Sequence, residues 1–210
     1  MKVLHITIDQ YRDWLLYKHY AHRLPNVTDA FGLFENNMLV GICTFGIPAS
    51  YTLCKGVCGE QHKDKVRELN RLCIDDNIST TKKNITSFFV GCCIRRMNHS
   101  GGIILVSFAD TAYNHHGYVY QATNWIYTGL TAKHIIPVTL NGKHSRHEDC
   151  DKAKDTVQRS RKHRYIYFVG TKKWVKQFKK DLKYPIAPYP KGDNIRYDTS
   201  YQPKIQGGLF

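Results

Sequence analysis

The chain of 210 residues lacks a long apolar segment. No window of roughly 18 residues is apolar throughout, which excludes an ordinary membrane-spanning helix. The first residues, MKVLHITIDQYRDW, also lack the apolar run that a secretory signal peptide requires. We therefore expect a cytoplasmic protein that has no membrane partner.

Acidic residues are scarce: the chain has 17 Asp and Glu against 31 Lys and Arg, a formal net charge of +14. The excess is concentrated between Lys143 and Lys183, where fourteen Lys and Arg face five Asp and Glu. A basic region of this kind favours a polyanionic partner such as nucleic acid. The alternative is a solvated basic surface that only aids solubility.

Seven cysteines are present, but no two pairs have the spacing of a zinc ribbon. Cys54 and Cys58 form a single CxxxC, and Cys92 and Cys93 are adjacent on a predicted helix, pointing apart. The sequence therefore favours reduced thiols over disulfides or structural zinc.

Periodicity predicts an α/β chain of one domain, residues 1–183, with a basic insertion at 141–163 and a tail at 184–210 that is rich in Pro and Gly. Between predicted strands, residues 46–65 have no clear period and predict a long loop. The predicted strands are 2–8, 30–34, 39–45, 67–74, 102–108, 134–140 and 165–169; the predicted helices are 9–22, 79–97 and 172–182. This order fits a mixed central sheet flanked by helices, and pattern alone leaves several α/β or α+β folds open.

The segment 102–129 is the most informative part of the sequence. The apolar run of residues 103–106 predicts a buried strand that ends at Ser107 and Asp110. A stretch rich in Tyr, His and Asn follows, up to Trp125. Strands that end in polar residues are how α/β enzymes present reactive groups at one edge of the sheet.

This segment, with ADTAYNHHGYVYQATNW at its centre, resembles the phage Mom DNA-modification family, a divergent branch of the GNAT acyltransferases. Further segments resemble the same family in order: HYAHRLP at 19–25, GICTFG at 41–46, ELNRL at 68–72, HRYIYFVG at 163–170 and YPIAPYPKGD at 184–193. The resemblance implies a GNAT-like fold. It does not extend over residues 141–160.

The resemblance also implies a transferase that converts adenine in DNA to N6-carbamoylmethyladenine, which protects phage DNA from host restriction. The substrate would be double-stranded DNA in the host cytoplasm, with the target base flipped into a pocket. A dimer is compatible with the sequence, which does not determine the oligomeric state. Two other functions stay open: an ordinary GNAT N-acetyltransferase acting on a small amine, peptide or RNA, and a non-catalytic DNA-binding anti-restriction protein.

Residue by residue, the candidate catalytic site of the family corresponds to His19, Tyr20, Arg71, Asp110 and Tyr120. His19, Tyr20 and Asp110 would suit iron, since their ligand atoms are nitrogen and oxygen. The alternative is acid/base chemistry, in which Asp110 receives a proton while His19 or Tyr20 orients it.

Donor binding is expected at Arg71, Ser79 and Thr80. Strand alternation predicts that Glu68 and Asn70 share one face and that Arg71 points to the other, where it binds an anionic group or pairs with Asp75 or Asp76. Residues 75–84 contain no glycine, unlike the pyrophosphate loop of ordinary GNAT enzymes. Acetyl-CoA is therefore not established as the donor, and another acyl or glycyl donor remains open.

DNA binding is expected in two places. Candidates for stacking on a flipped base are Tyr51, Tyr118, Tyr120 and Trp125, and Asn124 is a candidate for a contact to an adenine edge. The alternative for Tyr118 and Tyr120 is that they fill the core. The basic residues Arg161, Lys162 and Arg164 are candidates for phosphate contacts. A metal cluster of His and acidic residues in the insertion, at 144–150, is disfavoured because such patterns are common in exposed loops.

Overall fold

The computed structural model describes residues 1–97, 101–137 and 156–193. Within them, seven strands form one mixed sheet in the order β1-β2-β3-β4-β5-β9-β6. The strands are β1 (Lys2–His5), β2 (Asp29–Glu35), β3 (Met38–Gly46), β4 (Val66–Ile74), β5 (Ile103–Asp110), β6 (Ile126–Leu130) and β9 (Lys162–Val169). β4 and β5 pair in parallel and the other neighbours are antiparallel. The expected fold class, a mixed central sheet flanked by helices, is confirmed.

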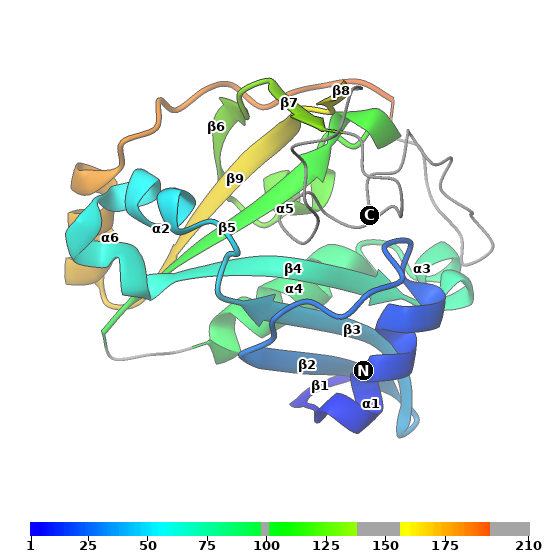
Figure 1. Cartoon of the computed structure of the whole chain (residues 1–210). Helices are drawn as coiled ribbons and strands as arrows, with labels where there is room; N and C mark the ends of the chain where they lie inside the picture. The colour runs from blue at the N-terminus through cyan, green and yellow to red at the C-terminus, as the bar shows by residue number, and fades with distance from the viewer. Residues whose placement is uncertain (98–100, 138–155, 194–210) are drawn as a thin grey trace.

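Helices cover the sheet in two layers (Figure 1). On one face, α4 (Ile85–Arg96) and α5 (Tyr118–Ala122) enclose the largest apolar core, which contains Trp125 and Tyr165. On the other, α2 (Tyr51–Cys58) and α6 (Lys172–Asp181) share a second core with β4, β5 and β9. A third core lies under α1 (Ile8–Asp13) and the π-helix that continues it.

Local sequence explains several boundaries. The β2–β3 turn forms at Asn36 and Asn37, whose positive φ angles of 48° and 65° suit asparagine. α2 begins after Ser50, whose hydroxyl accepts a hydrogen bond from the Leu53 amide at 3.2 Å. α6 begins after Thr171, and its one fully buried residue, Phe178, faces the core while its lysines face outward.

Some predicted elements are wrong. The loop expected at 46–65 contains α2 and a 3₁₀-helix, Glu60–Lys65. The helix expected over 79–97 is divided into α3 (Asp76–Thr81) and α4, because Asn84 adopts a left-handed conformation. The helix expected to reach residue 22 ends with the π-helix Trp14–Lys18. β6 was not predicted at all.

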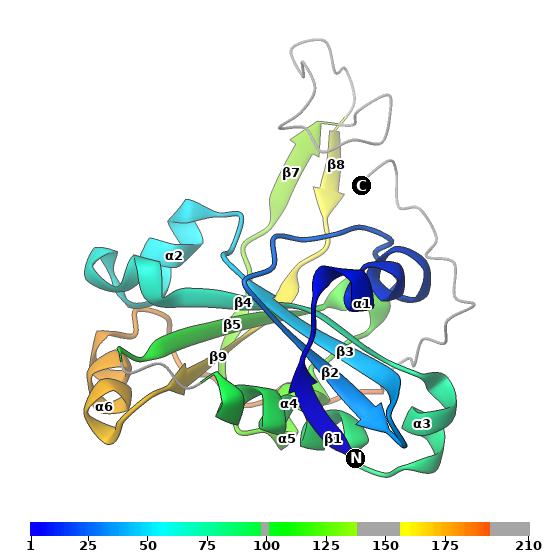
Figure 2. The ribbon, with the colours of Figure 1, turned by 90° about the horizontal axis from the view of Figure 1, so that it is seen from below.

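The region expected to be a polar insertion is partly structured. β7 (His134–Pro137) and β8 (Thr156–Arg159) form a separate two-stranded sheet. Figure 2 shows this sheet projecting from the body of the protein. The remainder, including the histidines and acids at 144–150, lies outside the described residues. Among the residues that are described, no helix has the length and apolarity needed to cross a membrane.

Candidate active site where β4 and β5 diverge

The parallel pair β4–β5 is short. Only Val66–Glu68 pair with Ile104–Val106, although β4 continues to Ile74 and β5 to Asp110. Figure 1 shows the two strands spreading apart toward their carboxyl ends. Carboxyl ends of parallel strands lie at the same edge of a sheet, so side chains from both strands meet where the pairing stops.

Ser107 and Tyr120 fill the point of divergence from the α5 side. The Ser107 hydroxyl donates to the Leu69 carbonyl of β4 at 2.9 Å and is hydrogen-bonded to the Tyr120 hydroxyl at 2.7 Å. Both side chains are buried, and burial raises the pKa of Tyr120. Tyr120 is therefore a neutral phenol at physiological pH, fixed by a hydroxyl that also bridges the two strands.

A β-bulge determines which side chains of β4 face the site. Thr44 of β3 pairs with Arg71, and the next residue, Phe45, pairs with Leu69, so Asn70 is an extra residue in β4. The Asn70 side chain accepts from the Thr44 hydroxyl at 2.6 Å and donates to the Asn26 carbonyl at 2.8 Å. An extra residue reverses the alternation of a strand. The expectation that Arg71 points away from Glu68 is therefore wrong, and the two share a face.

Glu68 and Arg71 form the charged part of the site. Burial raises the pKa of Glu68, while Lys162, Arg71 and Arg23 act in the opposite direction. The Arg71 Nη1 donates to the Asn70 carbonyl at 2.7 Å, and its buried Nε has no hydrogen-bond partner among the described residues. Asp75, one of the partners considered for Arg71, instead pairs with Lys18 at 3.8 Å. Arg71 thus keeps a donor for a ligand.

His19 and Tyr20 approach the same place from the end of the π-helix. The His19 amide closes that helix by donating to the Trp14 carbonyl at 2.9 Å. The His19 and Tyr20 rings are stacked, with centroids 4.4 Å apart. His19 is 5% exposed, and burial, followed by the charge of Arg71, lowers its pKa to about 3. The imidazole is therefore neutral at physiological pH.

Asp110 ends β5 beside these rings. Its Oδ1 accepts from the Ala112 amide at 3.0 Å, and its Oδ2 lies 3.1 Å from the Lys162 amine. The register of β5 and β9 places Lys162 directly opposite Asp110. The Asp110 side chain is 13% exposed, so the carboxylate is reachable from solvent and is neither remote from the first helical segment nor sealed in the core.

The structure thus brings the five candidate catalytic residues together. Electrostatic interactions connect Tyr20 to Arg71 and Asp110, His19 to Arg71, and Tyr120 to Tyr20. The group combines a neutral imidazole, two phenols, a guanidinium and a carboxylate. Such a set can hold an anion, donate hydrogen bonds and accept a proton.

Glu68 was not among the predicted site residues. It lies next to Leu69 in the strand motif ELNRL, and alternation without the bulge placed it on the face away from Arg71. The available signal was an acidic residue three positions before Arg71 in this motif. Its burial beside Arg71 and Lys162 makes it a second carboxyl group of the site.

The iron implied by the family resemblance does not fit these side chains as they are placed. His19 Nδ1 accepts from the Ala21 amide at 3.1 Å, so the single proton of the neutral ring is assigned to Nε2 and no lone pair is left for a metal. Both oxygens of Asp110 are engaged by Ala112 and Lys162. Among the described residues, no three His, Cys, Asp or Glu side chains form a metal-binding group. These side chains, as placed, therefore do not form an iron site.

Ser79 and Thr80 do not suit the donor-binding role expected for them. Both hydroxyls donate to the Asp76 carbonyl of their own helix, at 3.1 and 2.7 Å. The amino end of α3 is capped by the Asp75 carboxylate, which accepts from the Asn77 amide at 3.1 Å. A carboxylate at this position repels an anionic donor. Of the three donor-binding candidates, only Arg71 lies in the cluster.

Of the residues expected to contact a flipped base, Asn124 and Trp125 are adjacent and line one cavity beside α6, whereas Tyr118 contacts the tail. Trp125 is fully buried between Tyr120 and Tyr167, which does not suit stacking on DNA. Asn124 is exposed in a left-handed conformation, φ 60°, at the rim of a cavity of about 440 Å³ beside α6. The Tyr118 hydroxyl donates to the Gly192 carbonyl at 2.6 Å, which holds this part of the tail against α5.

The basic residues of β9 also differ in placement. The Arg164 guanidinium lies 3.3 Å from the centre of the Tyr184 ring and donates to the Thr128 hydroxyl and carbonyl. It is engaged inside the protein and does not suit a phosphate contact. Arg161 donates to the Thr131 carbonyl at 2.7 Å and Lys162 pairs with Asp110, so both belong to the rim of the candidate site.

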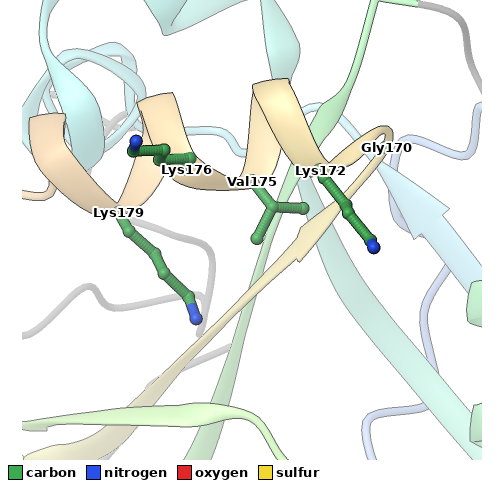
Figure 3. Close-up of a pocket in the computed structure, with 5 residues that line it drawn as sticks. All are labelled: Gly170, Lys172, Val175, Lys176 and Lys179. Carbon is green, nitrogen blue, oxygen red and sulfur yellow. The ribbon is translucent and has the colours of Figure 1, made fainter.

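A separate cavity of about 410 Å³ lies on α6, remote from the cluster. Figure 3 shows its lining, which comes from Gly170, Val175 and the lysines Lys172, Lys176 and Lys179. α6 begins beyond the far end of β9, about 23 Å from Lys162 at the usual rise of a strand. This basic surface is therefore distinct from the candidate active site.

Comparison with known proteins agrees with the sequence motifs. The profile of the Mom protein family matches residues 1–191. The curated protein "Methylcarbamoylase mom" of Escherichia phage Mu is 26% identical over 188 residues, which cover 83% of this chain and 77% of that protein.

Among solved structures, the chain is similar to the ribosomal-protein-S18-alanine N-acetyltransferase from Escherichia coli. The TM-score is 0.48 at 6% identity, over 81% of this chain and 94% of the other. It is also similar to an N-acetyltransferase from Staphylococcus aureus Mu50, with a TM-score of 0.41 at 16% identity over 77% of each chain.

Proposed function

Since the chain belongs to the Mom protein family, we propose that it is a transferase that modifies adenine in double-stranded DNA to N6-carbamoylmethyladenine. The modified base would protect the DNA from restriction. The single observation that carries the proposal is the convergence of His19, Tyr20, Arg71, Asp110 and Tyr120 where β4 and β5 diverge. A protein that only binds DNA has no need of such a group.

The chemistry requires one proton to leave the exocyclic nitrogen. The new bond between N6 and the methylene carbon of the carbamoylmethyl group replaces one of the two N6 hydrogens of adenine. The bond that joined this carbon to the donor breaks, and its electron pair leaves with the remainder of the donor. We assign the proton to Asp110, whose carboxylate is partly exposed and held in place by the Ala112 amide and Lys162. His19, neutral and carrying its proton on Nε2, is the hydrogen-bond donor that positions the reacting group.

Arg71 has the second role, binding an anion. Its buried Nε, which has no hydrogen-bond partner among the described residues, would donate to a negatively charged part of the donor or to a phosphate of the DNA. Glu68 balances the guanidinium when no anion is present. A carboxylate or phosphate of the donor would replace Glu68 as the partner of Arg71. Glu68 would then take up a proton, because its burial favours the neutral form of its carboxyl group.

The target base must leave the stack to reach these groups. Tyr113 is half-buried with its ring centre 5.6 Å from that of Tyr20, at the side of the cluster nearest Asp110. It is better placed for stacking on a flipped base than Trp125, which is enclosed in the core. A stacking contact of this kind stabilises binding by about 1–3 kcal/mol.

Mass spectrometry of nucleosides tests the proposal. DNA from cells that express the protein should contain deoxyadenosine that is heavier because a carbamoylmethyl group replaces one hydrogen. Asp110→Asn should reduce the mark by about 10²- to 10⁴-fold, the usual effect of removing a general base, while duplex DNA binding persists. The exposed Asp64→Asn, which makes the same chemical change away from the cluster, should mark DNA normally.

Three outcomes would contradict this function. Normal adenine alone, despite soluble protein and salt-dependent DNA binding, would indicate a non-catalytic DNA-binding protein. Tight acetyl-CoA binding in a calorimetric titration, with no affinity for DNA, would indicate an ordinary acetyltransferase. Equal loss of binding and marking in Asp110→Asn would make Asp110 a structural residue.

A further inference from the structure

The two-stranded ribbon formed by β7 and β8 has no pairing partner in the main sheet. Figure 2 shows it projecting from the body of the protein. Ile135 is 69% exposed, and its partner across the ribbon, Gln158, is also exposed. An isolated two-stranded ribbon is only marginally stable in water, so a partner that covers one face would stabilise it.

The root of the ribbon is fixed to the candidate active site. The amide and hydroxyl of Thr111, the residue after Asp110, donate to the Arg161 carbonyl at 3.1 and 2.7 Å. The Thr131 amide donates to the carbonyl of Lys162, the residue that pairs with Asp110. Ile135 follows Thr131 by four residues, so it lies within about 13 Å of this root, at about 3.3 Å per residue.

The ribbon and its root carry charge of one sign. The described residues 130–137 and 156–164 contain five Lys and Arg and no Asp or Glu. Lys162 pairs with Asp110, Arg164 is stacked on Tyr184 and Arg161 donates to the Thr131 carbonyl. This leaves Arg159 in β8 and Lys133 directly before β7. Within these described residues the projecting element is basic, which fits a polyanion and disfavours contact with a second copy of itself.

We propose that the β7–β8 ribbon enters the major groove of duplex DNA beside the base to be modified. This inference rests on the proposed function, since the adenine N6 lies on the major-groove edge. The major groove is about 12 Å wide and admits a two-stranded ribbon. Ile135 and Gln158 are opposite each other and share a face. Ile135 provides an apolar contact of the kind made to thymine methyl groups, and Gln158 a hydrogen-bonding pair for an adenine edge.

Dimethyl sulfate footprinting on duplex DNA tests the proposal, because the reagent methylates guanine N7 in the major groove and adenine N3 in the minor groove. The full chain should protect guanine N7 near the target.

The double variant Lys133→Gln with Arg159→Gln should lose this protection. The salt dependence of its affinity should fall by the equivalent of about two phosphate contacts. Ile135→Ser should keep the salt dependence but weaken the footprint. The matched control, Lys172→Gln with Lys176→Gln on α6, removes the same charge and should keep the footprint.

Other results would overturn the ribbon as a groove-binding element. These are protection of adenine N3 instead of guanine N7, an unchanged footprint in all ribbon variants, or ribbon variants that convert a dimer to a monomer in sedimentation while the footprint persists. The marking assay separates the two proposals. A footprint that depends on the ribbon, without any adenine mark, would contradict the transferase activity and support groove binding by the ribbon. Normal marking without a ribbon-dependent footprint would support the transferase activity and contradict groove binding by the ribbon.

Discussion

At the scale of single residues, the site depends on polar groups that burial keeps neutral. His19 is 5% exposed and Tyr120 is 8% exposed, and each has its pKa shifted by burial in the direction that removes its charge. Charge in the site therefore resides on Arg71, Lys162 and Asp110, and on Glu68 when no anion is bound to Arg71. A site of this kind is sensitive to pH through its stability as well as through its chemistry.

His19 gives the first pH prediction. Its pKa falls from 6.5 in the unfolded chain to about 3 in the folded protein. Between these values the unfolded chain binds a proton that the folded protein does not, so stability falls as the pH is lowered. From pH 6.5 to pH 5 this contributes a loss of about 2 kcal/mol. His163, whose pKa is also lowered by burial, contributes with the same sign. Urea denaturation at several pH values should therefore show a slope that is smaller in His19→Gln than in the natural protein by the contribution of His19.

The matched control is the exposed His134→Gln. It should leave the slope between pH 6.5 and pH 5 as it is in the natural protein. An unchanged slope in His19→Gln would show that His19 is protonated in the folded state, contrary to its burial beside Arg71.

At the scale of secondary-structure elements, the bulge in β4 is the feature on which the site depends. Asn70 is held by the Thr44 hydroxyl on one side and the Asn26 carbonyl on the other. Gly46 permits this approach, since a Cβ there would meet the Asn26 carbonyl oxygen at 1.9 Å. The bulge in turn places Arg71 on the face of Glu68.

A double-mutant cycle tests this arrangement. Asn70→Ala leaves the Thr44 hydroxyl, which is buried, without its acceptor, at a cost of about 1–3 kcal/mol. Thr44→Val removes the same hydrogen bond from the other side. Chemical denaturation of both single variants and the double variant should give a favourable coupling energy of about 1 kcal/mol. Strict additivity would contradict the hydrogen bond, and normal DNA marking by Asn70→Ala would contradict its role in positioning Arg71.

The elements with strong local patterns were predictable from sequence. The β2–β3 hairpin, the strands around Leu69, Leu105 and Ile166, and α6 all follow from periodicity and turn residues. α2 was missed because it is short and includes Gly56, a poor helix former that packs against Tyr184, where a Cβ would meet the Tyr184 hydroxyl at 2.6 Å. Tertiary contacts of this kind have no signal in the local sequence.

The sequence was sufficient to predict which residues form the candidate site, but not how their side chains are placed. Family motifs indicated His19, Tyr20, Arg71, Asp110 and Tyr120, and these residues lie together. Strand alternation placed Arg71 on the wrong face, because a bulge depends on pairing with β3 and with the Asn26 loop. The burial of Trp125 and the stacking of Arg164 on Tyr184 depend on packing between distant segments, which composition does not reveal.

At the scale of the whole molecule, the sheet consists of two antiparallel halves joined at one short seam. β1 to β4 form one half, and β5, β9 and β6 form the other. Three residue pairs connect them, at Val66–Glu68 and Ile104–Val106. Beyond the seam, the Ser107 hydroxyl of β5 bridges the halves by its hydrogen bond to the Leu69 carbonyl of β4, and the Tyr120 hydroxyl is bonded to Ser107. The candidate site thus lies where the two halves of the sheet separate.

Hydrogen exchange measures the strength of this seam. A β4 strand paired on both sides would protect all its amides, but beyond Glu68 the side facing β5 lacks a strand partner. Alternate amides between Leu69 and Ile74 should therefore exchange faster than their neighbours that bond to β3, because their opening requires only displacement of side chains. Duplex DNA containing the target adenine should slow these amides if the base enters the opening, and an abasic duplex should not. Uniformly slow exchange along β4 in the free protein would show that the two halves open only on global unfolding, and the opening would then not serve as an entrance for the base.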